Sequence, residues 1–262
     1  MNKRDPRILV YDIETTPCLA WVWRCGEQVV RHGQLHEDMN ETKVICVTYR
    51  WLHEDKAKAI VFDIDKQCDR DVIRKFDLLI DEADVILGKN NKRFDDKHIN
   101  MRRFRHGLTP KPDWTQKSDD LEKWMRKHFN MQSYALDYFD KITGGDGKIV
   151  MNMQDWIDIV SYHSNKSKAK KALSKMVEYG KKDADDTAEL INKVRPYVTP
   201  VFNHAAFHGD RRCVNCGSLN IREDREALHG QSRVVIYKCL DHGGSGGRAT
   251  ILKNGQLGKM KR

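Results

Sequence analysis

A pair of acidic residues near the amino terminus could hold a metal ion. Asp12 and Glu14 end an apolar segment whose β-forming residues predict a strand over Arg7–Thr15. Because side chains alternate along a strand, the two carboxylates point to the same face and repel each other. A divalent ion that prefers oxygen ligands, such as Mg²⁺ or Mn²⁺, would relieve that repulsion. Two surface acids at a strand end are the alternative that this pair alone leaves open.

A second acidic position follows another short strand. Val85–Leu87 is predicted as a buried strand that stops at Gly88, and a helix is predicted over Phe94–His106. Asp95 lies at the start of this helix, where the helix dipole favours a carboxylate. An ordinary helix terminus explains Asp95 equally well, and the adjacent Asp96 could take the same position.

A third acidic position lies on a long helix predicted over Lys168–Val194. Tyr179 and Asp183 are four residues apart, so their side chains are neighbours on one helical face. Gly180 stands between them, although a mid-helix glycine costs about 1 kcal/mol relative to alanine. A close approach of this helix to a sheet would explain the glycine. The alternative is a solvated helix face, because lysines and further acids surround the pair.

The carboxyl-terminal part of the chain contains cysteines with zinc-ligand spacing. The pattern C-x2-C-x22-C-x2-H is formed by Cys213, Cys216, Cys239 and His242. A glycine follows each pair and permits the turn around a metal, and two such pairs are hard to obtain by accident. One structural Zn²⁺ would stabilise this segment, since about 40 residues cannot bury a stable core alone. The fourth ligand stays open, because His229, His208 and His204 are alternatives to His242.

Length and charge indicate a second, smaller domain. The chain has 262 residues and a net charge of +9. Residues 199–262 contain 11 Lys and Arg against 5 Asp and Glu, whereas residues 1–198 contain 36 against 33. We therefore expect one domain over residues 1–198 and a basic zinc-ribbon domain over residues 199–262. The basic excess favours a polyanionic partner such as nucleic acid.

Periodicity predicts the elements that must position these residues. Further strands are predicted over Trp21–Arg24, Val44–Leu52, Ala59–Ile64, Arg233–Lys238 and Arg248–Leu252. Further helices are predicted over Asp69–Ala83, from a Ser118 cap to about Phe129, over Leu136–Lys141 and over Gln154–Tyr162. The sequence is therefore expected to form an α/β protein that starts with an antiparallel meander. The tryptophans interpreted as core or sheet residues are Trp21, Trp23 and Trp51.

Three acidic segments together resemble a known set of motifs. VYDIETTP, GKNNKRFD and YGKKD, in this order, resemble the three exonuclease motifs of the DnaQ-like DEDD superfamily. The third has the tyrosine form that defines the DEDDy branch, which includes the proofreading domains of family-B DNA polymerases. Lys89-Asn90 departs from the usual His-Asn of the second motif. The resemblance covers roughly residues 6–198.

The resemblance implies a ribonuclease-H-like mixed sheet flanked by helices and an active site with two Mg²⁺ or Mn²⁺ ions. The metal ligands of the superfamily carry over to Asp12, Glu14, Asp95 and Asp183. Two such ions activate a water molecule and stabilise the leaving 3′ oxygen. Tyr179 would orient that water, since a phenol with a pKa near 10 is a poor base. Asn90 and Phe94 would lie beside the terminal nucleotide.

The expected function is metal-dependent 3′–5′ exonuclease action on DNA, with a zinc ribbon that aids nucleic-acid binding. A 3′–5′ exoribonuclease on the same fold is an alternative, because recognition of the 2′-hydroxyl is a local contact. A catalytically silent nucleic-acid-binding module is a third reading. It would be expected to lack a carboxylate, and all four are present.

Partners and location follow from the same reading. We expect a single-stranded 3′ end of DNA as the main partner, and replication proteins as a further class to test. A DnaQ-like domain followed by a zinc ribbon resembles phage-encoded exonucleases, which suggests a role in replication or repair. The sequence contains no apolar run near 18 residues and no signal peptide, so we expect no membrane association. The expected compartment is the cytoplasm of a bacterial cell or a phage-infected host.

Overall fold

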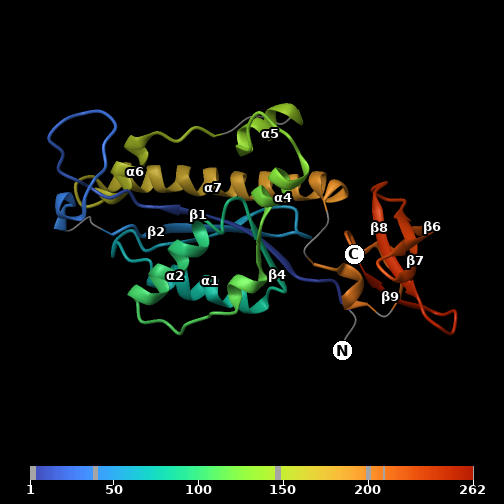
Figure 1. The fold of residues 1–262 in the computed structure, drawn as a ribbon. Helices are drawn as coiled ribbons and strands as arrows, with labels where there is room; N and C mark the ends of the chain where they lie inside the picture. Colours follow the sequence, from blue (N-terminus) through green and yellow to red (C-terminus); the bar gives the residue numbers. More distant parts are fainter. Residues whose placement is uncertain (1–3, 38–40, 145–148, 199–201, 209, 262) are drawn as a thin grey trace.

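A computed structural model of the chain describes residues 4–37, 41–144, 149–198, 202–208 and 210–261. Within these ranges the chain forms two sheets, and Figure 1 shows the larger sheet between helices and the smaller one beside it. The predicted domain boundary between residues 198 and 199 adjoins residues 199–201, which lie outside the described residues.

The larger sheet is mixed and has β1 at its centre. Its described strands are β1 (Ile8–Thr15), β2 (Val44–Trp51), β3 (Lys58–Val61), β4 (Val85–Gly88) and β5 (Ser118–Asp120), in the order β3-β2-β1-β4-β5. β1 pairs antiparallel with β2 and parallel with β4. β2 pairs antiparallel with β3, and β4 pairs parallel with β5. The predicted α/β class with a mixed sheet and a leading meander is confirmed.

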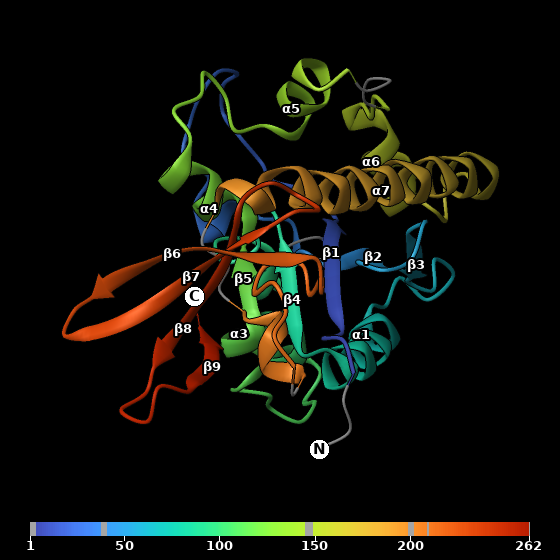
Figure 2. The same cartoon turned by 90° about the vertical axis from the view of Figure 1, so that its right-hand side faces the viewer.

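Helices cover both faces of this sheet. They are α1 (Arg70–Glu82), α2 (Asp95–Arg105), α3 (Trp114–Lys117), α4 (Leu121–His128), α5 (Leu136–Ile142), α6 (Met153–Val160) and α7 (Lys166–Val194). α7 packs across β1 and β2 on one face, whereas α1 packs against β2 and β3 on the other, as the end-on view in Figure 2 shows. Among the described helices, none is both long and apolar enough to cross a membrane.

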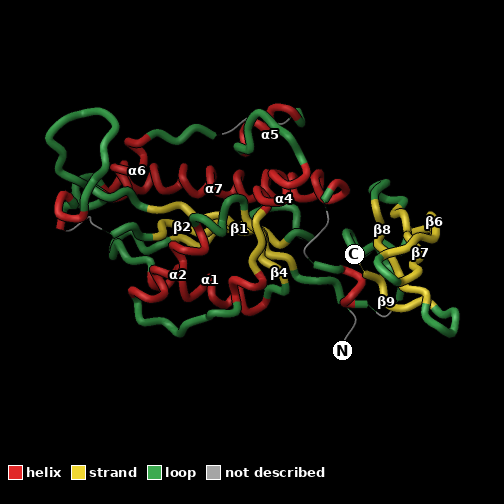
Figure 3. Tube along the Cα trace, viewed as in Figure 1, coloured by secondary structure: helices red, strands yellow, loops and turns green. Residues whose placement is uncertain are grey.

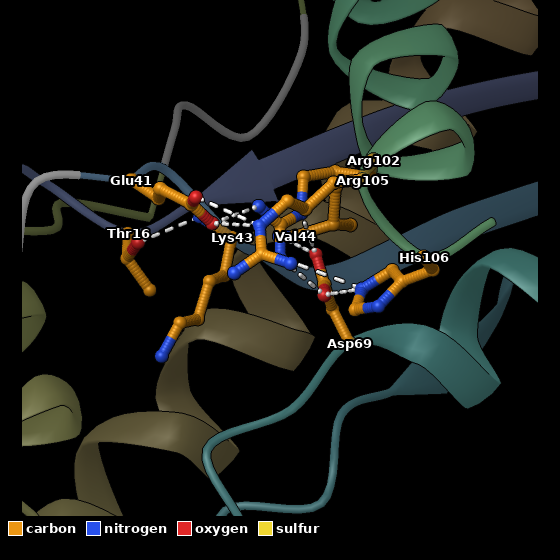
Figure 4. A network of polar contacts seen from close by, with 8 residues as sticks. All are labelled: Thr16, Glu41, Lys43, Val44, Asp69, Arg102, Arg105 and His106. Carbon is orange, nitrogen blue, oxygen red and sulfur yellow. Dashed lines mark hydrogen bonds and ion pairs between the residues drawn. The ribbon is translucent and has the colours of Figure 1, made fainter.

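A buried polar network holds α1, α2 and β2 together (Figure 4). Asp69, directly before α1, is fully buried and accepts hydrogen bonds from Nε and Nη2 of Arg102 at 2.7 and 2.9 Å. The Val44 backbone N–H at the start of β2 donates to the same carboxylate at 2.8 Å. Arg102 lies near the carboxyl end of α2, and Asp95 is the first residue of the same helix. The network therefore fixes the helix on which Asp95 lies.

Two predicted elements differ from the structure. Trp21–Arg24 is loop, and Trp21 and Trp23 are exposed, because among the described residues no strand of the sheet pairs with this segment. Trp51, by contrast, is buried on β2 as predicted. Ser118 does not cap a helix: it begins β5, which pairs with β4, and Asp120 caps α4 by accepting from the Glu122 N–H at 2.9 Å.

The smaller sheet is antiparallel. It contains β6 (Ile221–His229), β7 (Ser232–Cys239), β8 (Ser245–Ile251) and β9 (Leu257–Lys261), paired in that order and drawn in yellow beside the larger sheet in Figure 3. The two strands predicted here correspond to β7 and β8. Its small core includes Val214, Val235, Tyr237 and Ala249. β6 was not predicted because most of its side chains are exposed and polar, which leaves no apolar alternation to detect.

Candidate metal centres

β1 places two carboxylates on one face of the larger sheet. Ile8 and Val10 pack into the core that includes residues of α4 and α7, whereas Ile13 packs into the core that includes α1. Asp12 and Glu14 continue the face of Ile8 and Val10 and are half-buried. The strand alternation inferred from the sequence therefore aims both acids toward α7.

α7 brings a third carboxylate to this face. A Cβ atom on Gly180 would lie 2.8 Å from Cγ2 of Thr48 on β2, so a glycine is needed for this close approach. Asp183, about one turn further along α7, is 8% exposed. One carboxylate oxygen each from Asp12, Glu14 and Asp183 lies within 4.8 Å of the other two. The glycine predicted to mark a helix–sheet contact lies at that contact.

These three carboxylates form a donor set for a hard divalent cation. Three negative groups at this separation repel one another unless a cation or protons neutralise them. Carboxylate oxygens are the ligands that Mg²⁺ and Mn²⁺ prefer. Two of the three residues are half-buried, and Asp183 is buried. The chemistry of the residues thus fits a hard divalent cation.

Asp95 lies beside this triad. It is the first residue of α2 and is 3% exposed, and its Oδ1 accepts a 3.1 Å hydrogen bond from the backbone N–H of Ile13. Burial above all, with added repulsion from Asp96 and Asp120, raises the pKa of Asp95 to about 7. Its ligand atoms are not within the 4.8 Å grouping of the triad. The structure therefore brings three of the four predicted metal ligands together. The fourth, Asp95, is hydrogen-bonded to β1 at Ile13, between the two acids of that strand.

Asp96 has a separate role that the sequence did not reveal. It is 4% exposed, and its Oδ1 accepts hydrogen bonds from Tyr11 Oη at 2.5 Å and Asn91 Nδ2 at 3.1 Å. Its Oδ2 accepts from Ser118 Oγ at 2.9 Å. The buried carboxylate thus joins β1, β5 and the start of α2. The one available signal was the alternation of β1, which turns Tyr11 to the face opposite the metal triad.

The predicted substrate contacts lie on segments around the acids. Asn90 has a left-handed backbone with φ of 62°, and its N–H donates to Oδ1 of Asp120 at 2.9 Å. Phe94 is 42% exposed, with its ring centroid 4.4 Å from that of His98. Tyr179 is half-buried on α7, in the turn that precedes the third carboxylate of the triad. Phe94 therefore keeps an accessible aromatic face.

The four predicted zinc ligands converge at one end of the smaller sheet. They are Cys213, Cys216, Cys239 and His242, and one ligand atom of each lies within 4.8 Å of the others. Cys213 Sγ is 3.1 Å from His242 Nε2, and Cys216 Sγ is 3.7 Å from Cys239 Sγ. Thiolates bound 2.3 Å from a tetrahedral zinc ion lie about 3.8 Å apart. The spacing and the soft sulfur donors fit such an ion.

The local backbone and the remaining histidines agree with this ligand set. Gly217 and Gly243 have φ of 78° and 72°, so the glycines after each pair provide the left-handed turns that the pattern predicts. His204, His208 and His229 lie outside the described cluster. His208 instead contacts Asp5 Oδ1 at 2.9 Å. His242 is thus the fourth member.

Comparisons with known proteins add little to this geometry. No protein-family model matches the chain, and no curated protein does. Among solved structures, the family B DNA polymerase from the hyperthermophilic archaeon Pyrobaculum calidifontis is similar, with 15% identity and a TM-score of 0.48. The match covers 89% of this chain and 32% of the polymerase chain. Function is therefore inferred from the two residue clusters.

Proposed function

We propose that this chain is a metal-dependent 3′–5′ exonuclease that hydrolyses the terminal phosphodiester bond of DNA. The observation that carries the proposal is the convergence of Asp12, Glu14 and Asp183, from β1 and α7, within 4.8 Å. A cluster of carboxylates beside a buried strand suits the two-ion hydrolysis of phosphodiesters. The order of the three acidic motifs in the sequence supports the same assignment.

Each residue of the site has a proposed task. Two Mg²⁺ or Mn²⁺ ions would lower the pKa of a bound water and stabilise the leaving 3′ oxygen. The residues that would hold them are Asp12, Glu14, Asp95 and Asp183. The hydrogen bond from Ile13 fixes the orientation of the Asp95 carboxylate. Tyr179 positions the attacking water, and Asn90 and Phe94 contact the terminal nucleotide.

We further propose that residues 199–262 are a basic zinc-ribbon domain that aids nucleic-acid binding, and that residues 1–198 are the exonuclease domain. Support comes from the convergence of the Cys₃His cluster within 4.8 Å and from the net charge of the segment. Metal analysis of the purified chain should give one equivalent of zinc. A content well below one equivalent would reject the zinc site, whereas full zinc in His242→Ala would reassign the fourth ligand.

The nuclease proposal is tested with a 5′-labelled single-stranded DNA and Mn²⁺. We expect a ladder of products that shortens from the 3′ end, and its loss in Asp12→Ala and Asp183→Asn. Glu189→Ala is the matched control, because Glu189 is an exposed acid on the same helix. Undiminished cleavage in Asp12→Ala, or after chelation of the added metal, would contradict the proposal.

Cleavage rates on matched DNA and RNA strands of one sequence distinguish an exodeoxyribonuclease from an exoribonuclease. Faster cleavage of the DNA strand supports the exodeoxyribonuclease, and faster cleavage of RNA supports the exoribonuclease. Binding without cleavage of either strand, with Mn²⁺ at millimolar concentration, would support the catalytically silent module instead.

A further inference from the structure

The loop between β1 and β2 exposes two tryptophans. Trp23 is 100% exposed and Trp21 is 70% exposed, whereas Trp51, Trp114 and Trp124 are at most 6% exposed. Indole rings carry large apolar faces that folding normally buries. Two neighbouring exposed indoles therefore require an explanation outside the core, and such residues mark binding surfaces. We name residues 19–36 the tryptophan loop.

The base of the tryptophan loop is held by backbone pairing. The Trp21 N–H donates to the Gln34 carbonyl at 2.7 Å, and the His36 N–H donates to the Leu19 carbonyl at 2.8 Å. The Gln34 side chain also donates to the Trp21 carbonyl at 3.1 Å. These contacts fix the backbone that carries Trp21 and restrict the loop at its base, so less ordering is needed when a ligand binds.

The tryptophan loop follows the end of β1 that carries Asp12 and Glu14. Thr16, two residues after Glu14, is joined to Lys43 by hydrogen bonds of 2.8 and 2.9 Å. Figure 1 shows the loop, in blue, beyond the tip of β1. Trp21 is seven residues from Glu14, so an extended chain limits their separation to about 25 Å. A strand of a few nucleotides could span that distance.

The charge of the tryptophan loop suits a polyanion. Arg24 and Arg31 are both exposed, and Arg24 follows Trp23 directly. Glu27 is the one acid between them. Aromatic side chains next to arginines are the combination that binds single strands, since bases stack on the rings and phosphates meet the guanidinium groups.

We propose that the tryptophan loop is a stacking platform for single-stranded nucleic acid whose 3′ end enters the acidic triad. Trp23 and Trp21 stack on bases, and Arg24 and Arg31 contact the flanking phosphates. This proposal rests on the proposed nuclease function for the direction of the strand. The exposed arginines beside the indoles, on a loop that follows the strand of Asp12 and Glu14, favour nucleic acid over a membrane or a protein as the occupant.

Binding is measured in the Asp183→Asn background, without added divalent metal, so that no cleavage occurs. A 5′-fluorescein oligothymidylate is titrated by anisotropy, and the unlabelled strand by quenching of tryptophan emission. We expect Trp23→Ala to weaken binding about fivefold or more and to remove most of the quenching. Trp23→Phe should bind nearly as the parent does. Arg24→Ala and Arg31→Ala should each reduce the salt slope by about one.

Tyr197→Ala is the matched control. Tyr197 is 70% exposed, as Trp21 is, but it lies just after the far end of α7. Binding in this control should equal that of the parent. Unchanged affinity and quenching in Trp23→Ala would overturn the platform. So would a response to vesicles of phosphatidylcholine and phosphatidylglycerol that exceeds the response to the oligonucleotide.

The outcomes separate this inference from the nuclease proposal. If the metal-loaded wild-type chain cleaves nothing but the binding pattern above is obtained, the nuclease proposal fails and the platform stands as a binding site. If the chain cleaves DNA but Trp21→Ala, Trp23→Ala and the parent bind alike, the platform fails and the nuclease stands.

Discussion

At the scale of single residues, two adjacent acids on α2 have opposite surroundings. Asp96 accepts hydrogen bonds from three side chains, whereas Asp95 accepts from backbone N–H groups and is repelled by Asp96 and Asp120. Fully satisfied buried carboxylates stabilise a fold, and carboxylates whose charge is disfavoured destabilise it unless a cation is present. Substitution by asparagine should therefore have opposite effects at the two positions.

Asp95→Asn should stabilise the metal-free protein at neutral pH. The pKa of Asp95 is about 7 in the fold, against about 3.9 when unfolded. Between these values the unfolded chain releases the proton first, so the free energy of unfolding falls as pH rises from 4 to 7. The gain from Asp95→Asn should be absent near pH 4 and reach on the order of 4 kcal/mol at most above pH 7. Urea unfolding across this range measures it, and a gain that is independent of pH would contradict it.

Asp96→Asn should destabilise the protein by about 2 kcal/mol or more, because one of the two accepting oxygens becomes an amide N–H₂ group that cannot accept a hydrogen bond from its buried donors. The effect should persist in Mg²⁺, since Asp96 bonds the fold rather than a metal. Urea unfolding with and without Mg²⁺ checks this. A loss of stability that Mg²⁺ restores would instead assign Asp96 to the metal site.

At the scale of elements, the approach of α7 to β2 sets the geometry of the triad. Gly180→Ala should gain about 1 kcal/mol of helix propensity and lose about 1–3 kcal/mol through contact with Thr48. The displaced helix would carry Asp183 away from β1. We expect a several-fold higher Mn²⁺ concentration for half-maximal cleavage, measured by metal titration.

The matched rescue is Gly180→Ala with Thr48→Ala. Thr48→Ala removes Cγ2 and Oγ1 but keeps Cβ, which would lie 3.6 Å from the new methyl group at an ordinary contact distance. The double variant should recover most of the metal affinity, whereas Thr48→Ala alone should change it little. Failure of the rescue would show that the glycine does not act through Thr48.

The sequence predicted the long, strongly patterned elements and missed those that depend on pairing. The apolar stripe over α7 predicts a helix, and the β-forming run over β1 predicts a strand. These two predictions also give the positions of Asp12, Glu14 and Asp183. Ser118–Asp120 is a strand because β4 pairs with it, and no local pattern indicates that. The β-forming residues of Trp21–Arg24 pair with none of the described strands, so propensity alone predicted a strand there wrongly.

At the scale of the whole molecule, residues 199–262 carry most of the net positive charge. A depression of about 440 Å³ on the smaller sheet includes Arg225, Lys238 and Arg248, together with Asp224, in its lining. Replacing all three with alanine should weaken nucleic-acid binding and reduce the dependence of log K on log salt by up to about three, one for each phosphate contact. Cleavage of a short strand at low salt should persist.

The matched control removes three positive charges from α7 instead of from the smaller sheet. Lys168, Lys170 and Lys171 are exposed on the first turns of α7. Their joint replacement should leave the salt slope closer to that of the parent. Equal slopes for the two triple variants would mean that the charge of the smaller sheet is not used on nucleic acid.

If the carboxylates on β1 and α7 bind the catalytic ions as proposed, a crystal soaked in Mn²⁺ should contain these ions. Anomalous scattering should show two ions about 3.5–4 Å apart, bound by Asp12, Glu14 and Asp183, with Asp95 as a ligand of one of them. A crystal soaked in millimolar Mn²⁺ with no anomalous peak within about 2.5 Å of these carboxylates would contradict the claim.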